Sequence, residues 1–103
     1  MEQVAADFER LLGPDHPDTL TARASLAASY RSAGRTSEAI AIEKQVAADF
    51  ERIHGRVHPR TLMAWASLAA WYRSAGLTDE AIAIEKQVAA GRERLLGPDH
   101  PRP

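Results

Sequence analysis

The chain has 103 residues, of which 13 are Lys or Arg and 14 are Asp or Glu, so its formal net charge is −1. This length allows one small domain, and a composition of 45% hydrophobic and 26% charged residues is ordinary for a soluble globular protein. A general nucleic-acid binder is disfavoured because it needs an excess of Lys and Arg. The absence of cysteine excludes disulfides, thiolate metal sites and cysteine nucleophiles. No apolar run is long enough to span a membrane, and the first residues do not form a signal peptide, so we expect a cytoplasmic protein.

The sequence repeats itself at an interval of 42 residues. Residues 13–48 and 55–90 are identical at 28 of 36 aligned positions, and residues 1–12 resemble residues 43–54. Identity this high over so short a unit indicates a duplication. We therefore divide the chain into the partial second helix of a preceding repeat (1–12), a first repeat (13–54), a second repeat (55–96) and the start of a truncated next repeat (97–103).

Each repeat has the sequence features of two helices. In the first repeat, Pro17 suits the first turn of a helix, where its missing N–H leaves no bond unmade, and Gly34 suits a left-handed cap at the helix end. Thr36 is a candidate N-cap for a second helix, which ends before Gly55. The second repeat has the same pattern, so the sequence predicts an all-α array of tandem helical hairpins. Apolar residues of the first repeat recur at helical spacing, namely Leu20, Ala24, Leu26, Ala27, Tyr30 and Ala33, then Ala39, Ile42, Val46, Phe50 and Ile53.

The charged residues of the second predicted helix alternate in sign. This pattern is typical of a solvated helix face with modest support between charges one turn apart. We therefore expect these side chains in solvent: Glu38, Glu43, Lys44, Glu51 and Arg52.

Two sequence patterns resemble the tetratricopeptide repeat family. One is the 42-residue period with the phrase Gly-Pro-Asp-His-Pro-Asp-Thr-Leu at 13–20, which is similar to the long-helix repeats of kinesin light chains and of bacterial NB-ARC-type signalling ATPases. The resemblance covers nearly the whole chain. It implies an α-solenoid, a right-handed superhelix of about two and a half repeats, whose concave face binds peptides or proteins. The other pattern is the family's order of small and large residues, present as Trp65, Leu68, Ala69, Tyr72, Gly76 and Ala81.

The resemblance also implies which residues form the concave face. The chain departs from the family at Ala24-Ser25 and Ala66-Ser67, where the family often has asparagines, and at Glu43 and Glu85, where it usually has an aromatic residue. The positions that correspond to the concave face are Thr21, Ser25, Ala28, Arg31 and Ser32 in the first repeat and Met63, Ser67, Ala70, Arg73 and Ser74 in the second.

His16, His58 and His100 recur with the period. One helix layer of about 10 Å separates them, whereas zinc ligands lie within about 2.1 Å of one ion, so we interpret them as turn residues before a helix-starting proline. His54 at a helix end and Asp15 in a turn also have structural explanations. The chain has no nucleophile elbow and no Gly-rich phosphate loop. We therefore predict no catalytic, cofactor-binding or metal-binding residue, and no nucleotide binding.

The second repeat has tryptophans where the first has Arg23 and Ser29. The family position of Trp65 indicates a core residue. Trp71 lies off the main apolar stripe and is a candidate contact with another chain or with the next helix of an array. The unpaired flanks at both ends favour self-association, as a homo-oligomer or a domain-swapped dimer. Its candidate contact residues are Val4, Phe8, Leu11, Trp71, Ile84 and Val88.

Three functions remain open from the sequence. We favour a non-catalytic protein–protein interaction scaffold, a segment of a bacterial repeat array that binds a protein, a peptide or itself. The second is an engineered or excised repeat protein without a binding partner, which the near-identical repeats favour. The third is a ligand-binding domain or an enzyme, for which we find no convergent set of polar residues. We expect neither a nucleic acid nor a membrane among the partners.

Overall fold

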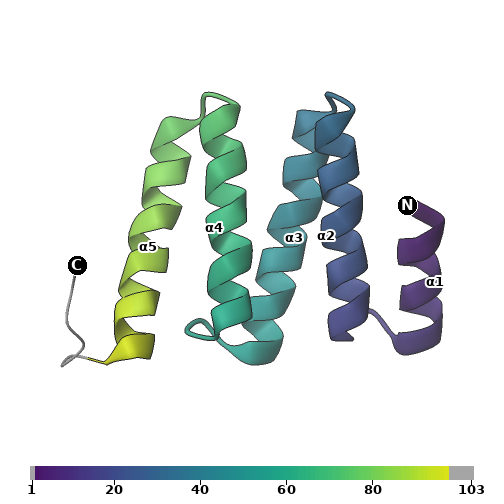
Figure 1. Ribbon diagram of the computed structural model, residues 1–103, viewed down its shortest axis with the longest axis horizontal. Helices are drawn as coiled ribbons and strands as arrows, with labels where there is room; N and C mark the ends of the chain where they lie inside the picture. The colour runs from purple at the N-terminus through teal and green to yellow at the C-terminus, as the bar shows by residue number, and fades with distance from the viewer. Residues whose placement is uncertain (1, 98–103) are drawn as a thin grey trace.

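The computed structural model describes residues 2–97, which form five α-helices and no strand. They are α1 (Glu2–Leu12), α2 (Pro17–Ser32), α3 (Thr36–His54), α4 (Pro59–Ser74) and α5 (Thr78–Leu96). The helices stand side by side in chain order (Figure 1), and close backbone contacts join each helix only to its neighbours in the sequence. This confirms the prediction of an all-α solenoid of tandem hairpins. None of the five helices is both long enough and apolar enough to cross a membrane.

A histidine followed by a proline begins α2 and α4. His16 and His58 are the N-cap residues, and each Nδ1 accepts a hydrogen bond from the backbone N–H two residues later, of Asp18 at 3.0 Å and of Arg60 at 3.1 Å. Each bond satisfies a backbone donor that the first helical turn cannot pair. The prediction that these histidines are structural is confirmed, while His100 lies outside the described residues.

The predicted helix ends are confirmed, but one predicted cap is wrong. Gly34 follows the end of α2 with a φ of 82°, a conformation that only glycine adopts without strain. Thr36 is not the N-cap of α3, because the N–H of Ala39 already bonds to the carbonyl oxygen of Arg35 at 3.0 Å. Arg35 therefore holds the N-cap position. Its Nε donates to Glu38 at 2.8 Å, which joins the turn to the first turn of α3.

Two buried clusters hold the hairpins together. Both contain residues of α2 or α3 and of α4, so the second hairpin packs on the first by apolar contacts. Apolar burial of this kind stabilises stacked repeats, since a single hairpin cannot bury both of its flanks. The larger cluster consists of Leu20, Val46, Ala47, Phe50 and Ala64, and the smaller of Ala27, Ala39 and Trp71.

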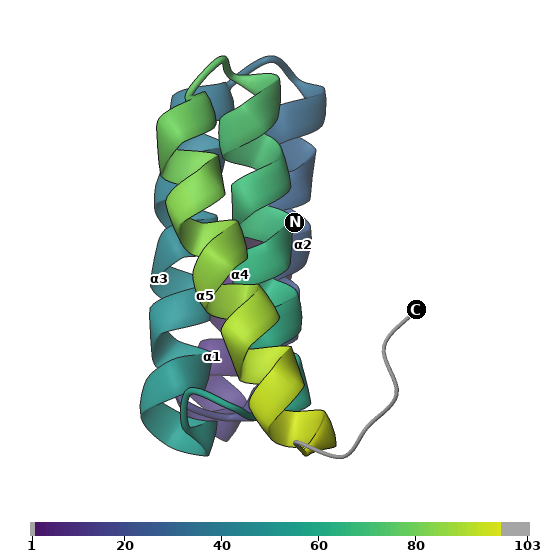
Figure 2. The same ribbon diagram turned by 90° about the vertical axis from the view of Figure 1, so that its left-hand side faces the viewer.

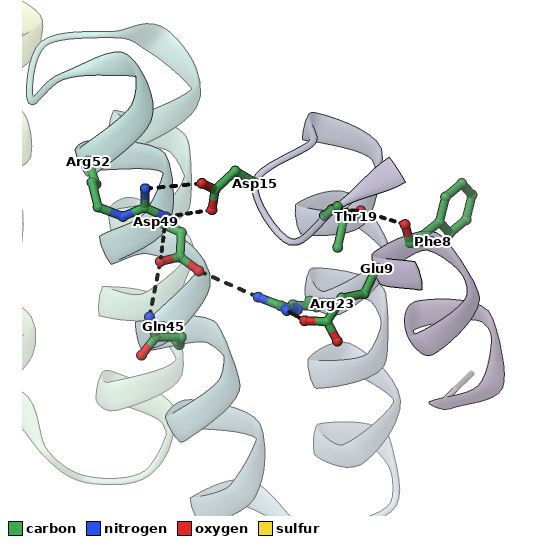
Figure 3. A network of polar contacts seen from close by, with 9 residues as sticks. Phe8, Glu9, Asp15, Thr19, Arg23, Gln45, Asp49 and Arg52 are labelled. Atoms are coloured by element: carbon green, nitrogen blue, oxygen red, sulfur yellow. Dashed lines mark hydrogen bonds and ion pairs between the residues drawn. The ribbon is translucent and has the colours of Figure 1, made fainter. Parts of the chain in front are cut away.

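A network of ion pairs joins the first three helices near the turn that precedes α2 (Figure 3). Arg52 on α3 bonds to Asp15 in this turn at 2.6 Å, and this hydrogen bond lowers the pKa of Asp15 from its ordinary value. Arg23 on α2 pairs with Glu9 on α1 and lies 3.5 Å from Asp49 on α3. The pairs on the surface, such as Arg52 with Asp15, add little stability, whereas Arg23 and Asp49 are mostly buried and link α2 to α3.

Replacing His58 tests the role of the histidine caps. His58→Ala removes the acceptor for the Arg60 N–H, so we expect the free energy of unfolding to fall by about 1 kcal/mol. His58→Asn keeps a side-chain acceptor and should lose less. Urea unfolding of the three proteins at neutral pH measures both effects. If the alanine and asparagine variants lost equal stability, the cap would not be the reason.

Candidate functional site

The helices α2, α3 and α4 enclose a groove of about 540 Å³. α2 and α4 form its walls and α3 its floor, because α3 packs against both, whereas no pair of Cα atoms from α2 and α4 lies within 8 Å. In the upper half of Figure 2, α2 and α4 lie on one side of the stack and α3 and α5 on the other. The volume is within the range of ligand-binding sites in proteins.

Half of the residues predicted for the concave face line this groove. The side chains on its walls are small or carry hydroxyl groups, apart from Arg60, Met63 and Trp71 on α4. The lining members of the predicted set are Thr21, Ser25, Ala28, Met63 and Ser67. The members that do not line it are Arg31, Ser32, Ala70, Arg73 and Ser74.

The most buried residues of the groove were not among those predicted for the concave face. Val46, Phe50 and Trp71 line it and are at most 9% exposed, and Glu43 lies among them. Arg60 on α4 also lines the groove. A signal for Glu43 was present in the sequence, because positions 39, 43, 46 and 50 follow the helical spacing of buried residues. Glu43 therefore occupies a core position of α3.

Glu43 corrects the prediction of a fully solvated charged face. It is 4% exposed, and it has no hydrogen-bond or ion-pair partner within residues 2–97. Burial raises the pKa of its carboxyl group from 4.5 to about 7. A carboxylate that leaves water without a partner is destabilised, so the group holds its proton to a higher pH.

Glu85, the equivalent residue of the second repeat, has a different environment. It is 44% exposed at its side chain, and its Oε1 accepts a hydrogen bond from Nη2 of Arg73. The equivalent Arg31 does not pair with Glu43. The guanidinium carbon of Arg31 lies 5.3 Å from the ring centroid of Trp71, and the same guanidinium hydrogen-bonds to α4. Arg31 thus contacts Trp71, which replaces a serine of the first repeat, instead of pairing with Glu43.

The structure buries Trp71 and leaves Trp65 only partly buried, which differs from the expectation for both. Trp71 is 9% exposed and packs with Ala27 and Ala39 of its own chain, so it does not offer the exposed surface expected of a self-association contact. It is buried because α4 packs directly on the first hairpin. Trp65, expected in the core, lies only partly buried at the edge of the larger cluster, where its Nε1–H donates to Glu51 at 3.1 Å.

The other self-association candidates divide between surface and interior. Val88 is 4% exposed and α5 packs only against α4, so this side chain is buried within its own hairpin and its prediction is wrong. Val4 and Leu11 on α1 are 44% and 74% exposed, respectively. Phe8 and Ile84 are half-buried. The exposed candidates therefore lie mainly on α1.

His54 lies at the end of α3, as predicted, and packs in the turn between the repeats. Its ring stacks on Phe50, with centroids 5.9 Å apart, and on His58, with centroids 4.5 Å apart. Within residues 2–97, no group of three or more histidine, aspartate or glutamate side chains is placed to hold a metal ion. The contacts that the structure shows for His16, His54 and His58 are capping and ring stacking.

Glu43→Gln should stabilise the protein in a pH-dependent way. At pH 8 the Glu43 carboxyl group is charged in both the folded and the unfolded protein, and folding must bury that charge. Below pH 4.5 the group is mostly neutral in both the folded and the unfolded protein. The stability that Glu43 removes therefore grows as the pH rises from 4.5 to about 7. We expect the variant to gain about 2–3 kcal/mol at pH 8 and almost nothing at pH 4. Urea unfolding at both pH values measures the gain.

Glu85→Gln is the matched control for this prediction. Glu85 is partly exposed and paired with Arg73, so its replacement should leave stability unchanged or slightly lower at pH 8. An equal gain for Glu43→Gln at both pH values would contradict the burial of a charge as its cause.

The chain is similar to known repeat proteins in sequence and in structure. Residues 1–52 and 61–102 match two family models, each described as tetratricopeptide repeat. Two crystal structures of a Podosopora anserina protein, described as a kinesin light chain with nearly identical TPR-like repeats, one of them a variant, each match with a TM-score of 0.82. Both are 32% identical over 97% of this chain, which spans 47% of that protein. No curated protein matches the chain in sequence. The resemblance inferred from the sequence is confirmed, and the chain belongs to the tetratricopeptide repeat family.

Proposed function

We propose that this chain is a non-catalytic scaffold whose groove between α2 and α4 binds a segment of a partner protein. Tetratricopeptide repeats generally mediate protein–protein interaction. The observation that carries the proposal is the groove of about 540 Å³, lined by five residues predicted for the concave face from the sequence.

The chemistry of the groove supports a peptide as its occupant. Thr21, Ser25 and Ser67 present hydroxyl groups on the walls, which can donate to and accept from the backbone of an extended chain. Met63 and Phe50 present apolar surface between them, and methionine adapts its shape to varied ligands. Apolar surface with a few polar groups is typical of small binding sites.

Filling the groove tests this proposal. Peptides of about 12 residues, selected from a random library on the wild-type chain, should bind Ala28→Trp about tenfold or more weakly, because an indole at this position occupies the groove. Fluorescence anisotropy with labelled peptides measures the affinities.

Ala70→Trp is the matched control for the filled groove. Ala70 is the equivalent position of the second repeat, is exposed and does not line the groove, so its variant should keep the wild-type affinity. Equal binding by the wild type and both variants would show that the peptides bind elsewhere and would contradict the proposed site.

We also propose that the chain associates with itself through its end helices. Exposed apolar side chains on α1 and α5 support this proposal: Val4 and Leu11 are 44% and 74% exposed, and Leu95 and Leu96 are 47% and 57% exposed. Bacterial origin, cytoplasmic location and the alternative of an engineered or excised repeat protein stay predictions from the sequence.

The mass in solution tests self-association. One chain has a mass of 11.3 kDa, so light scattering behind a sizing column should give a larger mass that falls to this value in Val4→Glu, which places a charge on the flank. Met63→Glu is the control, because Met63 is 64% exposed in the groove and not on an end helix. A wild-type mass of one chain at every concentration would refute self-association.

A further inference from the structure

The floor of the groove contains a glutamate, Glu43, that is not paired with a positively charged side chain of the described residues. Glu43 is 4% exposed and lines the groove, yet it has no hydrogen-bond or ion-pair partner in the part of the chain that the structure describes. It is also the only acidic residue among the described residues that line the groove. Buried acids are ordinarily paired, so an unpaired acid facing a groove indicates a place for a ligand's cation.

In the second repeat, the equivalent glutamate has a cation as its partner. Arg73 on α4 reaches Glu85 on α5 and hydrogen-bonds to it. The equivalent arginine of the first repeat, Arg31, is held instead over the ring of Trp71. Glu43 therefore lacks the cation partner that its equivalent in the second repeat has, although it lines the groove.

We propose that the groove selects a partner segment that inserts a lysine or arginine side chain beside Glu43. This inference rests on the proposed function of the groove. The carboxylate accepts charge-assisted hydrogen bonds from the ammonium or guanidinium group, which are stronger than bonds between neutral groups. Met63, Phe50 and Trp71 line the same groove and can cover the aliphatic stem of the inserted side chain.

The same acid discriminates against other segments. An acidic side chain in the groove places a second negative charge near Glu43, which raises the free energy of the complex. A purely apolar segment covers Glu43 without pairing it and so removes its remaining access to water. Both effects weaken the wrong ligands, which is how a site gains specificity as distinct from affinity.

Binding of a cation should depend on pH because it requires the ionised carboxylate. The pKa of Glu43 in the free protein is about 7, so near pH 5.5 only about 3% of the protein has the carboxylate ready. The charged groups that line or border the groove around it are Arg60 on α4 and Arg31 on α2, and neither lies within 4.0 Å of its carboxyl oxygens. Binding should therefore weaken about thirtyfold between pH 8 and pH 5.5.

The test uses two random libraries of peptides of about 12 residues without histidine, identical except for a fixed central lysine or a fixed central glutamate. Peptides are selected on the wild-type chain, and those that lose affinity for Ala28→Trp are kept as groove binders. Their affinities for the wild type, Glu43→Gln and the matched control Glu85→Gln are then measured by fluorescence anisotropy at pH 8 and pH 5.5.

We expect groove binders from the lysine library. Compared with the wild type at pH 8, their affinity should be about tenfold or more lower for Glu43→Gln and unchanged for Glu85→Gln. Their affinity for the wild type should be about thirtyfold lower at pH 5.5 than at pH 8. Lysine-containing groove binders that keep their affinity for Glu43→Gln would overturn the inference, and so would groove binders that come equally from both libraries. Either of these results would leave the proposed function intact. Selection of no groove binder from either library would overturn the proposed function itself.

Discussion

The burial of Trp71 between the two hairpins is the interaction on which the groove depends. The indole packs against Ala27 on α2 and Ala39 on α3, where two small side chains leave space for a large ring. Burying an aromatic side chain of this size stabilises a small protein by a large fraction of its net stability. The same ring forms part of the groove and holds the guanidinium group of Arg31. One residue of the second repeat thus takes part both in the stacking of the repeats and in the groove.

Near-identical repeats reach different contacts because each has different neighbours. Arg23 of the first repeat pairs with Glu9, and Trp65 at the equivalent position bonds through its indole N–H to Glu51, which is equivalent to Glu9. Both repeats thus keep a contact to the equivalent glutamate, although the donor is a guanidinium group in the first and an indole N–H in the second. At positions 43 and 85, in contrast, both repeats have a glutamate but its surroundings differ. The difference arises because α4 follows α3 and covers Glu43, whereas no helix within the described residues follows α5 to cover Glu85.

The sequence predicts the helices well because their signals are local. Proline at the first turn, histidine before it and glycine after the last turn act within a few residues, so they are read from one repeat alone. The burial of Trp71 and Glu43 depends on contacts between repeats, which no periodicity within one helix specifies. Thr36 fails as a cap for a local reason: Arg35 takes the N-cap position, and its side chain bonds to Glu38 in the first turn of the helix. The family resemblance predicts several residues on the walls of the groove, whereas the residues of its floor are known only once α4 is packed on the first hairpin.

An unpaired acid at a core position opposes the stability of the fold. Every other described position of that stripe in α3, at Ala39, Val46 and Phe50, carries an apolar side chain that stabilises the stack. An apolar residue at position 43 would remove the cost of a buried charge above pH 7 and leave the walls of the groove unchanged. Residues that break the local pattern at a stability cost are typical of functional sites, where the binding of a ligand compensates the cost. A cation bound at Glu43 would restore the missing pair, so that the state with a partner would be more stable than the free chain by the free energy of that contact.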